Sequence, residues 1–143
     1  MTADDEAEAL IRARDFTGAE KLLAKAAKAA PDSARVQHLL GVAVHEQGNF
    51  DRAIACYRKA AGIDAGIAGL WRDLGAACTE KRRYGDALEA YREAMRRDAN
   101  DEIACQGAAS ALREMGDIVE ARKLFQRALW LRIRRWFRLG RAG

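Results

Sequence analysis

The chain has 143 residues, of which half are apolar and about a third are charged, so it is long enough to bury a core and too apolar for a disordered chain. Its three widely spaced cysteines argue against a disulfide framework and a C-x-x-C metal site, and no P-loop, G-x-S-x-G or H-E-x-x-H motif indicates an enzyme. The net charge of +4 is unevenly distributed, because the segment from Glu120 onward has eight Arg and Lys side chains and one carboxylate. The rest of the chain is mildly acidic, so the overall positive charge is no reason to interpret the whole protein as a nucleic-acid binder.

The first segment, residues 2–33, opens within the acidic stretch MTADDEAEAL. A secretory leader has a basic start and an apolar core, so this opening argues against one. No apolar run in the chain approaches the length of a transmembrane helix. With the odd cysteine count, these features predict a reduced, cytoplasmic protein.

The second segment, residues 34–67, has the pattern of two helices. Apolar residues recur at helical spacing until the stretch QGNF breaks the pattern. Gly48 permits the positive φ that ends a helix, and Asn49 is a favoured N-cap for the next one. The second helix of this pair is therefore expected from about Phe50 to Ile63.

The pattern of the second segment repeats through the whole chain with a period of 34 residues. Small residues in two columns should let helices approach closely, and bulky residues in two others should fill the space between them. Because one helix pair cannot bury its apolar face alone, the four units are predicted to stack around one continuous core. The columns are Ala19, Ala53, Ala87 and Ala121; Ala26, Ala60, Ala94 and Ala128; Leu23, Tyr57, Tyr91 and Phe125; and Phe16, Phe50, Tyr84 and Ile118.

The third unit carries the best-preserved motif, which consists of Trp71, Leu74, Gly75, Cys78, Tyr84, Ala87, Tyr91 and Ala94. This motif resembles the tetratricopeptide repeat (TPR) family, except that Cys78 stands where an aromatic residue is usual and Ala99 where proline is usual. The resemblance implies an all-α, right-handed superhelical solenoid of four helix-turn-helix repeats with an extended C-terminal basic helix. The implied domains are residues 1–132, divided at about 2–33, 34–67, 68–101 and 102–132, and a basic amphipathic helical tail or cap at 133–143.

By the same resemblance, the first helices of the repeats line a concave groove that binds a peptide or a partner helix. The implied function is a non-catalytic protein-protein interaction or scaffold module that needs no cofactor, no metal and no small-molecule substrate. The groove should be acidic at the first repeat and more basic from Arg35 to Arg113, which favours an acidic partner. Helical geometry assigns to the groove Arg12, Arg35, His38, Val42, His45, Arg72, Asp73, Thr79, Gln106, Ser110 and Arg113.

Two other functions stay open at this point. The chain can be a self-assembling structural unit, or the N-terminal regulatory region of a larger bacterial enzyme whose catalytic domain follows Gly143. His38 and His45 lie about 10 Å apart along one helix, too far to share a metal ion, and are interpreted as polar groove residues. The cysteines are expected to be buried small hydrophobic residues.

The last helix is expected to continue to about Leu139, because no proline or glycine occurs before Gly140. Its apolar side chains should either cap the open end of the solenoid or mediate self-association as a homo-oligomer. Trp130 is expected to reach its own repeat, and Trp136 and Phe137 to overhang. Binding to an anionic membrane or to nucleic acid is the less favoured interpretation. The residues assigned to the cap or to self-association are Trp130, Ile133, Trp136 and Phe137.

Overall fold

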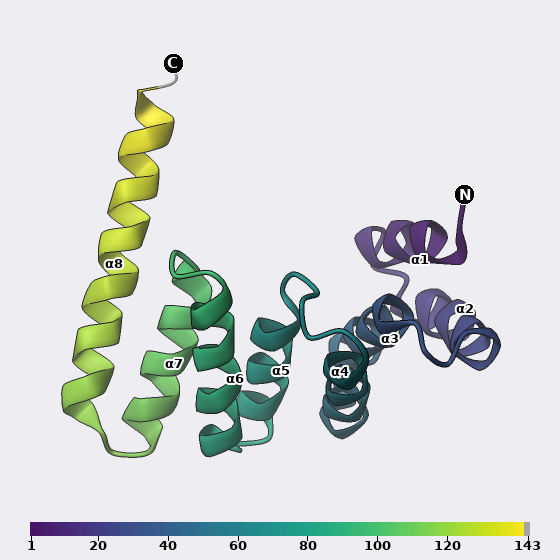
Figure 1. Ribbon diagram of the computed structural model, residues 1–143, viewed down its shortest axis with the longest axis horizontal. Coiled ribbons are helices and arrows are strands. Elements are labelled where there is room, and N and C mark those ends of the chain that lie inside the picture. Colours follow the sequence, from purple (N-terminus) through teal and green to yellow (C-terminus); the bar gives the residue numbers. More distant parts are fainter. Residues whose placement is uncertain (142–143) are drawn as a thin grey trace.

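The structure is a computed structural model that describes residues 1–141, and the regular structure of these residues is entirely helical. Four antiparallel helix pairs follow one another in a row from the N-terminus to the C-terminus (Figure 1). Each helix packs against the next in the chain, and the first helices of neighbouring pairs also touch. The predicted all-α solenoid is confirmed. The pairs are α1 (Ala3–Arg12) and α2 (Phe16–Ala29); α3 (Ala34–Glu46) and α4 (Phe50–Ile63); α5 (Leu70–Glu80) and α6 (Tyr84–Arg97); α7 (Glu102–Glu114) and α8 (Ile118–Gly140).

In each pair, the residue at the same position of the turn between the two helices has a left-handed backbone conformation. Gly48 and Gly116 have φ values of 82° and 88°, as the break at QGNF predicted for the second pair. Arg14 and Arg82 occupy the same column in the other pairs, with φ values of 62° and 57°. Glycine adopts this conformation without steric cost, whereas a side chain with a Cβ does not. The turn geometry is therefore imposed by the packing of the pair.

Side-chain caps begin six of the eight helices. The first of them is a capping box, in which Thr2 and Asp5 each bind the other's backbone N–H group. Each cap satisfies a backbone donor that the helix itself leaves free. The two helices without a side-chain cap, α5 and α6, follow Gly69 and Arg83. The capping residues are Thr2, Asp15, Ser33, Asn49, Asp101 and Asp117.

The core lies between the pairs, in the columns that the repeat defines. Ala53 and Ala87 are fully buried, and Tyr57 and Tyr91 are almost so. A Cβ built on Gly75 would lie 2.8 Å from the ring of Tyr91, so this glycine is required for the close approach of α5 and α6. The column of Ala53 and Ala87 is buried throughout, as predicted, whereas the bulky column of Phe50 and Tyr84 is only half-buried and its last member, Ile118, is 52% exposed. All three cysteines are free and buried, as expected: Cys56 and Cys78 lie in this core, and Cys105 lies in a smaller cluster with Ala128 and Leu131.

The last helix extends well beyond its partner α7 (Figure 1). It continues to Gly140, close to the predicted end, whereas its last buried side chain is Leu131. We call residues 132–140 the overhang. Among the helices of residues 1–141, none is both long and apolar enough to span a bilayer. Residues 142 and 143, the end of the predicted tail 133–143, lie outside the described part of the chain.

Candidate binding groove

The first helices α1, α3, α5 and α7 carry the side chains that were assigned to the groove. Three contacts join neighbouring first helices to one another, the last of them through the residue that caps α7. In each contact an arginine or a histidine meets a carboxylate. We call these contacts the ion-pair ladder. They run from the first repeat to the fourth, so the groove wall is cross-linked at every junction between repeats.

The first contact of the ladder joins α3 to α1. Arg35 lies 3.6 Å from Asp4 and also pairs with Glu8, and its side chain stays 54% exposed. Two of the four carboxylates of α1 therefore pair with the first cation of the second repeat. Because guanidinium has five N–H donors, Arg35 keeps donors for a further acceptor.

The second contact joins α3 to α5. His38 Nε2 lies 2.7 Å from Asp73 Oδ2, and the His38 side chain is only 13% exposed. The ring of Tyr57 lies under both histidines of α3, with centroids 5.8 Å from His38 and 6.4 Å from His45. Burial, and then the neighbouring Asp73 and Glu46 carboxylates, raise the pKa of Tyr57 far above its ordinary value. This phenol is therefore a neutral floor beneath the histidines.

The third contact joins α5 to the start of α7. Arg72 lies 3.4 Å from both carboxylate oxygens of Asp101, which is 11% exposed. Asp101 also caps α7 by accepting the N–H of Ala104 at 2.9 Å. One carboxylate thus fixes the start of a helix and orients a cation that stays 37% exposed. Asp101 was not among the assigned residues, although an aspartate just before a helical pattern signals a cap.

The other assigned side chains lie near the ladder with weaker partners. The Thr79 hydroxyl donates to the Gly75 carbonyl in its own helix, at 2.9 Å. His45 meets the ring of Phe50 edge-on, at 5.3 Å between centroids. Four side chains complete the set without a side-chain hydrogen bond within residues 1–141. Arg12 and Gln106 are exposed, and Val42 and Ser110 are half-buried.

Arg113 lies near the end of α7, in the column of His45 and Thr79. Its guanidinium lies 5.8 Å from the centroid of Phe125 in α8 and 3.7 Å from Glu114. Together with Ile118 and Leu129 it lines a hollow on the outer side of α8. His45 contacts the ring of Tyr57, the equivalent of Phe125, from the same column, so the assignment of Arg113 to the groove stays a prediction.

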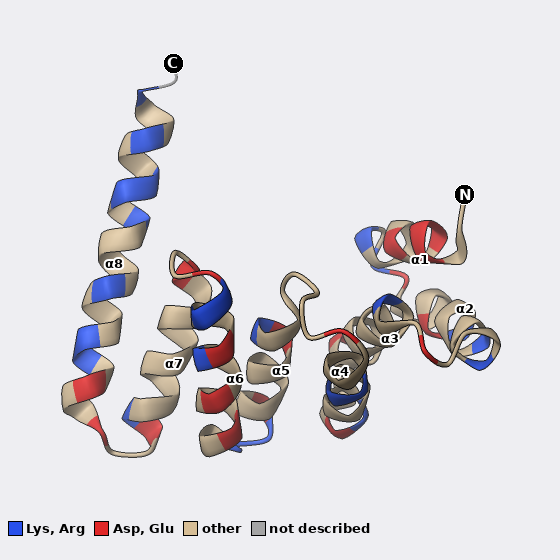
Figure 2. Cartoon of the chain, in the orientation of Figure 1, with Lys and Arg blue, Asp and Glu red and all other residues tan. Residues whose placement is uncertain are grey.

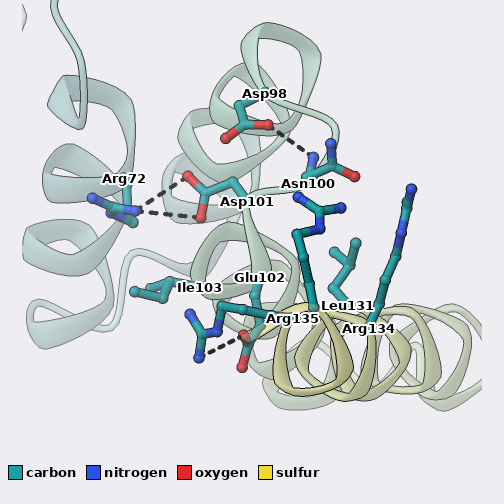
Figure 3. A pocket seen from close by; sticks show the side chains of 10 residues that line it. Arg72, Asp98, Asn100, Asp101, Glu102, Ile103, Leu131, Arg134 and Arg135 are labelled. Carbon is teal, nitrogen blue, oxygen red and sulfur yellow. Dashed lines mark hydrogen bonds and ion pairs between the residues drawn. The ribbon is translucent and has the colours of Figure 1, made fainter. Parts of the chain in front are cut away.

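A cavity of about 310 Å³ lies where the ladder meets the overhang (Figure 3). Arg72 points into it from α5, and Arg134 and Arg135 come from α8. Glu102, in the first turn of α7, is 10% exposed and binds Arg132 at 2.7 Å and Arg135 at 3.2 Å. These two pairs fasten the start of the overhang to α7.

The aromatic side chains of the last helix are exposed, so they do not cap the chain's own repeats. Trp136 and Phe137 are 69% and 58% exposed and lie against each other, with ring centroids 5.0 Å apart. Trp130 does not reach its own repeat, since it is 56% exposed with Arg134 over its ring. The reason is helical phase: Leu131 points toward α7, and the neighbouring position points away from it. Self-association through Trp130, Ile133, Trp136 and Phe137 stays a prediction.

Charge is divided along the chain as the sequence indicated. In Figure 2, blue segments recur along most of α8 with red only near its start, and α1 has red segments with blue at its end. The groove between them carries both signs, because the ladder pairs cations with carboxylates. The basic character of the protein is therefore strongest on α8.

Comparisons with known proteins agree with this geometry. Residues 5–66 match the tetratricopeptide repeat family. Over 99 residues the chain is 28% identical to the tetratricopeptide repeat domain-containing protein PYG7, chloroplastic, of Arabidopsis thaliana, an alignment that covers 66% of this chain and 33% of that protein. Over 79 residues it is 34% identical to the peroxisomal targeting signal receptor of Candida albicans, with 52% and 13% covered. The chain thus spans a third or less of the length of these relatives.

Solved structures share the fold over nearly the whole chain. A crystal structure of MamA superposes with a TM-score of 0.88 at 21% identity, covering 93% of this chain and 78% of that one. A second MamA structure gives a TM-score of 0.82 at 23% identity, covering 92% and 76%. At these identities the likeness concerns the fold.

Fold and groove together define a helical-repeat solenoid, in which stacked helix pairs present one extended wall. The period, the small-residue columns and the matched segment identify the family, and the chain is a tetratricopeptide repeat protein. This fold is that of a protein-protein interaction module.

Proposed function

We propose that the protein is a non-catalytic interaction module whose groove binds an extended or helical segment that carries acidic side chains. The observation that supports this most is the ion-pair ladder, in which Arg35 and Arg72 stay 54% and 37% exposed beside their carboxylates. The protein is proposed to act in the cytoplasm, in keeping with its free cysteines.

The ladder suits an exchangeable contact. Exposed ion pairs contribute only about 0–1 kcal/mol each, so a partner carboxylate can replace Asp4 beside Arg35 at little cost. At Arg72 a partner carboxylate would join Asp101, which stays in place as the cap of α7. The bidentate geometry of guanidinium gives such a contact direction as well as attraction. The Candida albicans relative is by its name a receptor for a targeting signal, which accords with recognition of a short segment.

His38 and Asp73 should have a different role from the two arginines. Their short contact is mostly shielded, and it sits between the two exposed guanidinium groups. We infer that this pair keeps α3 and α5 in register while Arg35 and Arg72 contact the partner. Replacing His38 should therefore weaken binding through the shape of the groove.

A peptide-display selection tests the proposal. Random peptides are selected on the intact chain, and the recovered peptides are then measured against Arg35→Glu, Arg72→Glu and the double variant. Arg92→Glu is the matched control, because Arg92 is an exposed arginine on the second helix α6.

The proposal predicts that the recovered peptides are enriched in Asp and Glu and that their affinity falls as the salt concentration rises. Arg35→Glu and Arg72→Glu should each lower the affinity about tenfold or more. The control should bind as the parent does. Peptides without acidic enrichment, or equal losses in the groove variants and the control, would contradict the proposal. Circular dichroism of each variant verifies that the helices are retained.

A further inference from the structure

The outer side of α8 has no covering helix within residues 1–141. Ile118 and Leu129 are 52% and 55% exposed, and a hollow of about 360 Å³ lies among them, Phe125 and Arg122. We call these four residues the end face. It is distinct from the overhang, which begins beyond Leu131.

In the preceding repeats the columns of Phe125 and Arg122 are buried wherever they hold apolar residues, and the columns of Ile118 and Leu129 are half-buried. Tyr57 and Tyr91, which correspond to Phe125, are 1% and 6% exposed. They are covered because α5 packs on α4 and α7 packs on α6. In the last junction, Cys105 Sγ of α7 lies 3.4 Å from Met95 Sδ of α6. The repeat itself therefore shows what covers this surface: a first helix of the same kind.

The first helix α1 has the complementary uncovered side. Ala9 is exposed, although its equivalents Ala43, Ala77 and Ala111 are completely buried against the preceding repeat. Ala3 is also exposed, although its equivalents Gln37 and Cys105 are buried. Small residues here would let a helix with bulky side chains approach closely. Ala3 is the equivalent of Cys105, and Cys105 contacts Met95, which is the equivalent of Leu129.

Each of the two faces has a charged residue where the internal junctions have an apolar one, and the two charges are opposite in sign. In α8, Arg122 replaces the buried Ile54 and Leu88, and in α1 Glu6 replaces the buried Leu74. Both substitutions fall in columns that line the junction between repeats. A carboxylate on one face and a guanidinium on the other satisfy each other when the faces meet.

We propose that the end face of α8 binds α1 of a second copy, so that copies continue one solenoid end to end. The contact is heterologous, and it leaves one free α1 and one free end face for further copies. Two α8 helices facing each other are disfavoured, because residues 121–141 bear eight cations and no carboxylate. This inference is independent of the groove and of its partner.

Sedimentation velocity of the intact chain and of two charge-reversed variants tests the contact. Glu6→Arg places two cations at the junction and Arg122→Glu places two carboxylates there, so each variant alone should self-associate about tenfold or more weakly than the parent. A mixture of the two variants restores opposite charges at every junction and should recover association. Glu80→Arg, an exposed reversal on α5, should associate as the parent does.

Each other result has a definite meaning. A parent that stays monomeric at all concentrations overturns the proposal. Loss of association in Arg122→Glu but not in Glu6→Arg assigns the contact to paired α8 helices. Loss on truncation after Arg135, with Glu6→Arg unaffected, assigns it to the overhang. A monomer whose tryptophan fluorescence shifts on vesicles of anionic phospholipid assigns the surface to a membrane. Each of the last three overturns end-to-end stacking.

Discussion

At the residue scale, the turn column shows where local and global demands conflict. Arg82 adopts a φ of 57° at a position where Gly48 and Gly116 fit without strain. A left-handed residue with a Cβ costs about 1–2 kcal/mol, so Arg82→Gly should raise the free energy of unfolding by about 1 kcal/mol. Gly116→Ala, the reverse change in the same column, should lower it by a similar amount. Urea unfolding measures both, and a destabilised Arg82→Gly would mean that this arginine has a contact more valuable than the strain.

The three thiols offer a second test at this scale. Burial raises the pKa of Cys56, Cys78 and Cys105 above the ordinary thiol range. Since the thiolate is the reactive form, the folded protein should react slowly with a disulfide reagent at neutral pH and quickly in denaturant. One thiol that reacts at the unfolded rate in the native protein would show that its repeat opens.

At the element scale, the helix crossings depend on the small columns. Ala87, in α6, is completely buried. Ala87→Leu should overpack the crossing and lower stability by about 1–3 kcal/mol. Ala29→Leu, at an exposed helix position, is the control and should have little effect. Equal thermal midpoints for the two variants would mean that the crossing is placed wrongly.

The anchoring of α8 is the second element-scale test. The nearly buried Glu102 holds Arg132 and Arg135, so Glu102→Ala should cost about 1–3 kcal/mol of stability. Truncation after Arg135 keeps both contacts and removes Trp136 and Phe137, and it should leave the unfolding midpoint nearly unchanged. If this truncation unfolded the repeats, the exposed aromatic pair would have a structural role that the packing does not show.

Elements were more predictable from the sequence than contacts between them. The bounds of α4 agree with the prediction because a cap, Asn49, and a turn glycine, Gly48, precede it directly. The ladder partner Asp101 was missed, because it stands one residue before the helical stripe and meets Arg72 only through the stacking of repeats. Trp130 was assigned to its own repeat because spacing gives the neighbours on a helix, whereas the buried side depends on where α7 lies.

At the scale of the whole molecule, the repeat separates three surfaces with different chemistry. The groove has paired charges with exposed arginines, the two ends have complementary small and bulky faces, and the overhang has arginines with exposed aromatic rings. The core therefore uses the columns that repeat, and the proposed recognition uses positions that vary between repeats. This division explains how one fold can keep its core while its binding side chains change.

The most direct test of the groove is amide chemical-shift mapping with an acidic peptide recovered by the selection. The account predicts that the largest shifts fall on α3 and α5, around Arg35, His38 and Arg72, and that they disappear with the Arg35→Glu/Arg72→Glu double variant. Shifts confined to the second helices or to the overhang, with the amides of α3 and α5 unmoved, would contradict it.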